Sequence, residues 1–204
     1  MELTSSQTDA LTELINIGYA RAAGALSDLT GHRISLEVPN VVIHPIHQIS
    51  PLLQKVIASE VASVNQLFAG SIAGNAILIL DREAALLLNR VLTNRPEVQI
   101  FDGAAREVIT EVGNIVLNAC LGVFGNLLQV QVTFTVPRLQ IASVSEVLKL
   151  IAIEGCELNY ALMIHTRFHM RTNDVSGYLV IILGVKSLDR LLIELKKWEE
   201  RQLA

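Results

Sequence analysis

Two pairs of side chains in this sequence have the types and spacing to do chemistry. Glu13 and Asn16 lie three positions apart, and Glu111 and Asn114 repeat that spacing 98 positions later. On a helix, residues three apart share one face. A carboxylate there can pair with a cation, and a carboxamide has an acceptor oxygen and two N–H donors with which to hold a water molecule. Each pair is therefore a candidate site.

The two pairs belong to an internal repeat. Residues 13–17 are Glu-Leu-Ile-Asn-Ile and residues 111–115 are Glu-Val-Gly-Asn-Ile. In both copies 22 residues separate the asparagine from a proline, Pro39 or Pro137. Self-similarity at a fixed offset indicates a duplicated structural unit. We therefore expect a single domain that consists of two homologous halves.

The order of the predicted elements supports this division at residue 95. Hydrophobic periodicity predicts a long helix, a strand, a short helix, two strands and a closing helix in each half. In the first half, 1–95, the elements are expected at 6–30, 33–42, 50–58, 61–68, 74–80 and 81–93. In the second half, 96–204, they are expected at 104–128, 131–141, 145–151, 158–170, 177–185 and 187–204.

The strand predicted at 158–170 indicates the kind of sheet. Apolar side chains alternate there with His165, Arg167 and His169. This alternation is typical of an antiparallel sheet with one face in solvent. Together with the helices it predicts an α/β fold of the α+β kind, with an antiparallel sheet and two long exposed helices.

Each pair of candidate residues extends into a narrow stripe along its helix. At about 100° per residue, the first stripe comprises Asp9, Glu13, Asn16 and Ala20, and the second comprises Glu107, Glu111, Asn114 and Asn118. The opposite faces are apolar and are expected to be buried. They comprise Leu11, Leu14, Ile15, Gly18, Ala22, Ala25, Leu26 and Leu29, and Ile109, Val112, Gly113, Val116, Cys120, Val123, Phe124 and Leu127. Both stripes should therefore face solvent.

Solvated surface residues inherited by duplication would give the same pattern, since polar side chains are mostly exposed. The presence of two copies favours a function, because exposed side chains diverge after duplication unless something uses them.

The duplicated motif resembles that of the CheC family of chemotaxis phosphatases, which is related to CheX and to the flagellar switch protein FliY. Asp9, Glu13, Asn16 and Pro39 fit the first copy, and Glu111, Asn114 and Pro137 fit the second. Glu107 stands where the family has Asp or Ser. The resemblance covers nearly the whole chain and implies a pseudo-twofold, CheC-like fold.

The resemblance also implies a function, the hydrolysis of the aspartyl phosphate of phospho-CheY or a similar response-regulator receiver domain. The catalytic residues would be Glu13, Asn16, Glu111 and Asn114, and the partner-binding residues would be Asp9, Glu107, Pro39 and Pro137. An acyl phosphate has a good leaving group and reacts through a largely dissociative transition state, so a well-placed water matters more than a strong base. The resemblance implies no cofactor on this chain, because the receiver supplies the magnesium. It also implies CheD, the receptor deamidase, as a second partner.

One departure from the family motif bears on the relative importance of the two copies. The family has Gly before the asparagine, and the first copy has Ile15 there. We therefore expect the second site to contribute more than the first.

Composition excludes several other classes of function. The formal net charge is -4 and the basic residues form no run, which argues against binding to nucleic-acid phosphates. A hydrophobic fraction of 51% indicates a large core. We expect no membrane span, no signal peptide and a cytoplasmic location with reduced cysteines.

Histidines and cysteines give no metal or nucleophile prediction. His165 and His169 are four apart on a strand, which separates them by about 13 Å, too far for one ion. His44 and His47 bracket Pro45 and are expected to be solvated. Cys120 is expected to be a small core residue, and carboxylates flank Cys156 and would raise its pKa.

The main alternative to a phosphatase is a non-catalytic adaptor that binds a receiver or CheD, related to flagellar switch proteins. A third alternative is a signalling or transcriptional adaptor that binds a different receiver domain.

Overall fold

The computed structural model describes residues 3–37, 41–57, 60–153, 158–170 and 173–203. The first half contains α1 (Ser5–Thr30), β1 (Ser35–Glu37), β2 (Val41–Pro45), α2 (Ile46–Val56), β3 (Val61–Gly70), β4 (Gly74–Asp81) and α3 (Arg82–Thr93). The second half contains α4 (Gly103–Leu127), β5 (Val132–Phe134), β6 (Arg138–Ala142), α5 (Val144–Ile153), β7 (Leu158–His169), β8 (Asp174–Gly184) and α6 (Val185–Leu203). The second half thus repeats the element order of the first.

The strands predicted at 33–42 and 131–141 are each two short strands. In the second half the interruption falls at residues 135–137, where Pro137 has no N–H to donate to a ladder. Thr135 there donates its backbone N–H to the carbonyl of Leu67. The chain therefore stays beside β3 while the regular ladder is interrupted.

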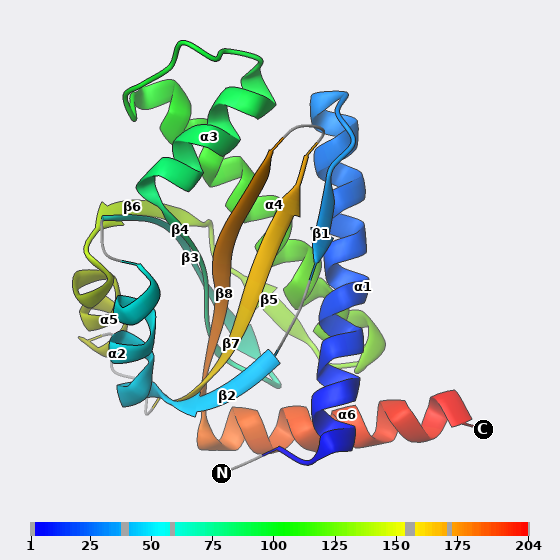
Figure 1. Cartoon of the computed structure of the whole chain (residues 1–204). Helices are drawn as coiled ribbons and strands as arrows, with labels where there is room; N and C mark the ends of the chain where they lie inside the picture. Colours follow the sequence, from blue (N-terminus) through cyan, green and yellow to red (C-terminus); the bar gives the residue numbers. More distant parts are fainter. Residues whose placement is uncertain (1–2, 38–40, 58–59, 154–157, 171–172, 204) are drawn as a thin grey trace.

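The strands form one antiparallel sheet of eight strands in the order β1-β7-β8-β4-β3-β5, with β2 also paired to β7 and β6 to β3 (Figure 1). The halves meet at the β4–β8 pair, where Ala76 lies opposite Ile181. Each half also gives its short strands to the other half, because β1 and β2 pair with β7 while β5 and β6 pair with β3. The two halves are therefore interlocked through the sheet.

Side chains from the two faces of the sheet enter two separate cores. The larger core lies between the sheet and the helices α1, α3, α4 and α6, and contains Ala76, Leu78 and Leu80 of β4. The smaller core lies on the other face, where Ile77 and Ile79 pack with residues of α2. The second face of the sheet is thus partly covered, whereas the sequence predicted one that was wholly exposed.

The long helices α1 and α4 pack against each other, and α4 also packs on β3 and β4 (Figure 1). Close approach is possible because of two glycines. A Cβ on Gly18 would lie 2.9 Å from the Cα of Cys120, and a Cβ on Gly113 would lie 2.5 Å from Val64 side-chain atoms.

Each of the two long helices exposes one side and buries the other, as the stripe pattern predicted. By length and composition α4 could cross a membrane, and half of its most apolar window is buried within the fold. From the sequence we expect no apolar stretch of that length, and α4 differs from this expectation. Packing between α1 and the sheet accounts for the apolar character of α4, since a helix buried on several sides is hydrophobic on most of them.

Candidate functional site

The first stripe lies on the open surface of α1. Asp9, Glu13 and Asn16 are all exposed, and no hydrogen bond or ion pair engages their side chains among the described residues. The helix begins at a capping box in which Thr4 and Gln7 satisfy each other's backbone N–H groups. Ile15, next to Asn16 in sequence, is 1% exposed and packs in the large core. The carboxylate and the amide of this copy are therefore free to meet a partner.

The second stripe is less open. Glu107 and Glu111 are exposed, while Asn114 and Asn118 are half-buried. The Asn114 amide donates to Glu111 Oε2 at 3.4 Å, and its Oδ1 accepts from Asn118 Nδ2 at 2.6 Å. The prediction that the whole stripe faces solvent is thus only partly correct.

A residue of the sheet extends this chain of hydrogen bonds. Gln66 of β3 donates its Nε2 to Asn118 Oδ1 at 2.9 Å and to the Thr135 carbonyl oxygen at 2.9 Å. Gln66 is 2% exposed. The Asn114 oxygen is therefore linked, through Asn118 and Gln66, to the loop between β5 and β6.

Among the described residues, the first copy shows no such chain, and two positions differ. Phe168 of β7 pairs with Leu36, and Phe68 of β3 pairs with Phe134, so the two phenylalanines occupy equivalent positions in the two halves. Two residues before each of them, Thr166 therefore occupies the position of Gln66. The Thr166 hydroxyl is hydrogen-bonded to the buried hydroxyl of Tyr19.

In addition, Ala20 of the first stripe takes the place of Asn118 and has no polar group. No hydrogen bond from the described part of the sheet therefore reaches Asn16, so the two amides have different surroundings.

Of the two prolines of the motif, Pro137 lies within the described residues and Pro39 does not. Pro137 is half-buried, between β5 and β6 and two residues beyond Thr135. Pro39 lies outside the described residues, as does Cys156. The proposed contact of Pro137 with a partner therefore has a structural location close to the second stripe.

Buried titratable groups under the stripes are structural. Burial raises the pKa of the Cys120 thiol, which confirms its prediction as a core residue. Burial also raises the pKa of the Tyr19 hydroxyl, and the neighbouring Cys120 adds to this. Both groups stay protonated at neutral pH and cannot serve as nucleophiles.

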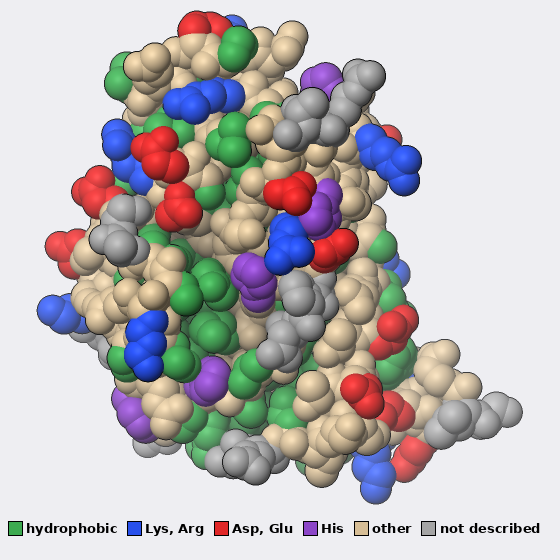
Figure 2. Space-filling view, in the orientation of Figure 1, with side chains coloured by type: hydrophobic (Ala, Val, Ile, Leu, Met, Phe, Trp, Pro, Cys, Tyr) green, Lys and Arg blue, Asp and Glu red, His purple; other side chains and the backbone are tan. Residues whose placement is uncertain are grey.

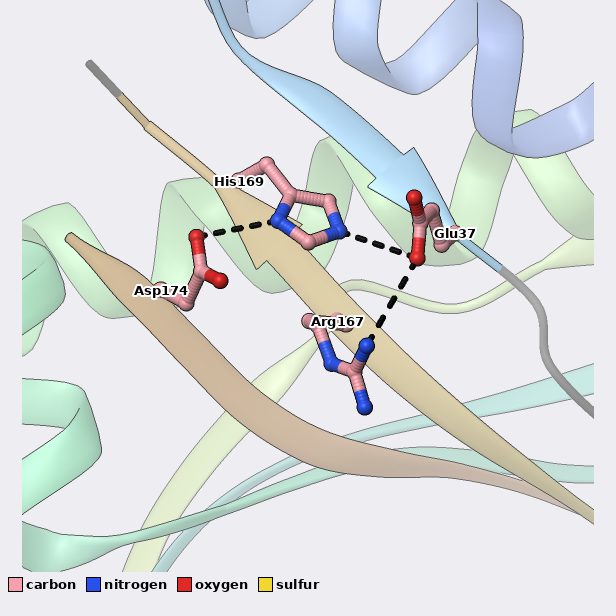
Figure 3. Close-up of polar contacts among 4 residues, drawn as sticks. All are labelled: Glu37, Arg167, His169 and Asp174. Carbon is pink, nitrogen blue, oxygen red and sulfur yellow. Dashed lines mark hydrogen bonds and ion pairs between the residues drawn. The ribbon is translucent and has the colours of Figure 1, made fainter. Parts of the chain in front are cut away.

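A charged cluster that no sequence motif indicates lies on the other face of the sheet. His169 of β7 lies between Glu37 of β1, with Nε2 to Oε2 at 3.0 Å, and Asp174 of β8, with Nδ1 to Oδ1 at 2.9 Å (Figure 3). Arg167 approaches the same Glu37 oxygen at 3.7 Å. Hydrogen bonds to the Glu37 and Asp174 side chains raise the pKa of His169.

This cluster joins three neighbouring strands, which sequence spacing alone could not bring together. Figure 2 shows histidines and charges of both signs on this face, between α1 and the α2–α5 pair. The cluster ties the short edge strand β1 to the sheet. Among the described residues, no group of three His, Cys, Asp or Glu side chains has the arrangement of a metal site.

Comparison with known proteins identifies the fold and the first motif. A model of the CheC-like family matches residues 7–43, which span α1 and β1 and reach into β2. The crystal structure of Thermotoga maritima FliY superposes with a TM-score of 0.79 at 16% identity, and the match covers 97% of this chain and 100% of that one.

Two further structures have the same fold. The FliM middle domain from H. pylori gives a TM-score of 0.65 at 11% identity, covering 94% of this chain and 99% of that one. CheX in the CheX-CheY-BeF3-Mg+2 complex from Borrelia burgdorferi gives 0.51 at 20% identity, covering 82% and 96%. The resemblance inferred from the sequence motif is therefore confirmed: the α1 segment matches the CheC-like family, and the whole chain has the fold that FliY, CheX and FliM share.

Proposed function

We propose that this protein hydrolyses the aspartyl phosphate of a phosphorylated CheY-like receiver domain. The observation that supports this most strongly is the solvent-facing pair Glu13 and Asn16, one turn apart on α1, inside the segment that matches the CheC-like family. A fold neighbour, CheX, forms a complex with CheY, BeF3 and Mg+2. We propose that this chain binds a partner of the same kind.

In the proposed mechanism, α1 approaches the phosphorylated aspartate of the receiver. The Asn16 carboxamide holds a water in line with the scissile P–O bond, using its oxygen as acceptor and its N–H groups as donors. Fixing that water converts an encounter into a near-attack geometry, which can lower the barrier by several kcal/mol. Glu13 pairs with the active-site lysine of the receiver and so fixes the register between the two proteins.

The same chemistry is available to Glu111 and Asn114 once the hydrogen bonds of Asn114 rearrange. Its oxygen already accepts from Asn118, so only part of its bonding capacity is free for a water. We therefore propose that the first copy is the principal site and the second a weaker one, the reverse of the order expected from Ile15 alone.

Magnesium enters this proposal on the receiver and not on this chain. The phosphoryl oxygens and the metal belong to the substrate protein, into which the phosphatase inserts its two side chains. Such a reaction takes place where receiver domains are found, so we place the protein in the cytoplasm. CheD stays a proposed second partner.

The test is the loss of label from a phosphorylated receiver domain with and without this protein. Wild-type protein is expected to accelerate the loss, and Asn16→Ala with Asn114→Ala in one chain should abolish the acceleration. Circular dichroism must show that the double variant is folded. Unchanged turnover by that variant would reject the proposal.

The alternative is a receiver-binding adaptor without catalysis. The fit to FliM favours it, since structures of FliM in complex with FliG and with SpeE show this fold in protein assemblies. The engaged amide of Asn114 favours it as well. Binding of the phosphorylated receiver by wild-type protein without faster phosphate release would establish the adaptor.

A further inference from the structure

The C-terminal helix α6 creates a groove beside the first stripe. Figure 1 shows α6 crossing the foot of α1 and continuing beyond it. Between the two helices and the end of α4 lies a groove of about 720 Å³. We call it the α1–α6 groove.

The α1–α6 groove has an apolar floor and an acidic rim. The floor comprises Ala10, Ile17, Leu127 and Trp198. The rim comprises Asp9, Glu13, Glu199 and Gln202. Every charged side chain that lines the groove is thus a carboxylate.

Two details suggest that the groove is suited to a ligand. Trp198 is 8% exposed, and its indole Nε1 has no hydrogen-bond acceptor among the described residues. The Trp198 ring therefore gives the groove an apolar wall, and its buried Nε1 is closed to an occupant. Of the carboxylates, Glu199 accepts from the Ser6 hydroxyl, and Asp9 and Glu13 have no partner in the described part of the chain.

Arg201, one residue before Gln202 on α6, is already engaged. The Arg201 guanidinium donates to the Leu127 carbonyl oxygen at 2.9 Å, which fixes α6 to the end of α4. It therefore does not neutralise the rim by direct pairing with Asp9 or Glu13.

The two closing helices differ in length, and the longer one, α6, is the one that lies beside the first stripe. Helix α3 has 12 residues and α6 has 19. The repeat offset relates Leu127 to Leu29, and Leu29 is 63% exposed whereas Leu127 is half-buried. The additional turns of α6 cover the end of α4 and leave the end of α1 bare.

We propose that the α1–α6 groove is a docking surface for the receiver domain itself, a contact made at the first site and absent from the second. It binds a receiver segment that carries a lysine or arginine beside a bulky apolar side chain. The cation meets the carboxylates of the rim, and the apolar side chain lies over Ile17 and Leu127. This inference rests on the proposed function, because Glu13 belongs both to the groove and to the first stripe.

Gln202 offers the sharpest test, since it lines the groove, is exposed and has no partner among the described residues. Gln202→Lys should raise the KM for the phosphorylated receiver, and Gln202→Glu should lower it, each by about 2- to 5-fold with kcat unchanged. Both effects should fade near 1 M salt, where the Debye length is about 3 Å. A purely structural role for Gln202 would not give opposite signs.

The matched control is Glu97→Gln, which changes the net charge by the same amount as Gln202→Lys. Glu97 lies in the connection between α3 and α4, at the opposite end of the molecule from α6 (Figure 1). KM should not change in this variant. Shifts of equal sign in the two Gln202 variants, or shifts no larger than that of Glu97→Gln, would overturn the docking inference.

A second measurement separates failure of the groove from failure of the proposed function. The same variants are titrated with a BeF3-activated receiver, a stand-in for the phosphorylated one that does not turn over. If wild-type protein fails to accelerate hydrolysis but the Gln202 variants still shift the dissociation constant in opposite directions, the groove stands and the phosphatase does not. If Asn16→Ala abolishes hydrolysis while the Gln202 variants change nothing, the phosphatase stands and the groove does not.

Discussion

At the scale of single residues, the two asparagines differ in what their amides already bind. Asn16 is exposed and has no partner in the described residues, whereas Asn114 accepts from Asn118 at 2.6 Å. A water-positioning amide must present both its oxygen and its N–H groups to the incoming water and phosphoryl group. The first copy meets this requirement as it stands, and the second must first give up a hydrogen bond.

The structure therefore predicts that Asn16→Ala lowers receiver dephosphorylation more than Asn114→Ala does. Removing one positioned donor from a reacting site commonly costs about 100-fold in rate. We expect the first variant to lose about that factor and the second to stay close to wild type, because the first site continues to work and carries nearly all of the turnover. Phosphate release at fixed receiver concentration measures both, and equal losses or the reverse order would contradict this ranking.

Helical periodicity was sufficient to place Glu13 and Asn16 correctly on the surface and Leu11, Leu14 and Ile15 in the core. It was wrong for Ala25 and Leu29, which are exposed, because α1 extends past the elements that would cover its last turn. It could not show that Gln66 reaches α4. That contact depends on which strand lies beneath the helix, and no local pattern specifies this.

At the scale of elements, the crossing of α1 and α4 depends on a residue without a side chain. A Cβ on Gly18 would lie 2.9 Å from the backbone of Cys120, while a Cβ on Gly24 of the same helix would meet nothing within 4 Å. The two glycines therefore allow a matched comparison within one helix.

Gly18→Ala should destabilise the protein by about 1–3 kcal/mol, the usual cost of overpacking a tight contact. Gly24→Ala should leave stability unchanged or raise it by up to about 1 kcal/mol, since alanine is the better helix former. Denaturant unfolding followed by circular dichroism gives both values. Equal effects of the two substitutions would show that α1 and α4 can move apart at Gly18 without a loss of unfolding free energy.

The cluster around His169 should make the attachment of β1 dependent on pH. The pKa of His169 is raised by its hydrogen bonds to Glu37 and Asp174. A group whose pKa is higher in the folded state stabilises that state fully below its unfolded pKa of about 6.5, and the contribution is lost as pH rises through the folded pKa.

His169→Gln should therefore cost more stability at pH 5 than at pH 8. The measurement is the difference in unfolding free energy between wild type and variant at the two pH values. In an Asp174→Asn background the pH dependence should shrink, because one of the two carboxylates is gone. If the difference is the same at both pH values, the charged cluster around His169 does not attach β1 in a pH-dependent way.

The order of elements was predictable from sequence to within a few residues, apart from the division of 33–42 and 131–141 into two strands each. Alternation along 158–170 correctly placed Leu162, Ile164 and Phe168 in the core. The charged cluster around His169 was not predictable, because Glu37, His169 and Asp174 come together only through the pairing of three strands.

At the scale of the whole molecule, the internal repeat is visible in the sequence but its consequence is not. The motif at 13–17 and 111–115 indicates two similar halves, yet the exchange of β1, β2, β5 and β6 between them follows only from the observed sheet. That exchange makes the β4–β8 centre and both edges parts of one sheet. The two stripes therefore lie on helices that pack on one continuous sheet.

The similarity of the halves also conceals a functional asymmetry. Helix α6 exceeds α3 by two turns, and it lines a groove next to the first stripe. Together with the free amide of Asn16, this makes the first half the better candidate for the principal site. The match of the CheC-like family model to residues 7–43 falls on the same half.

In the proposed mechanism, Asn16 places a water and does not merely bind the partner. The most direct measurement compares kcat for release of phosphate from a phosphorylated receiver with the dissociation constant for the BeF3-activated receiver, in wild type and in Asn16→Ala. We predict that kcat falls about 100-fold, while the dissociation constant changes less than about threefold, within the range of a lost surface contact. An unchanged kcat, or a loss of activity fully explained by weaker binding, would contradict the account.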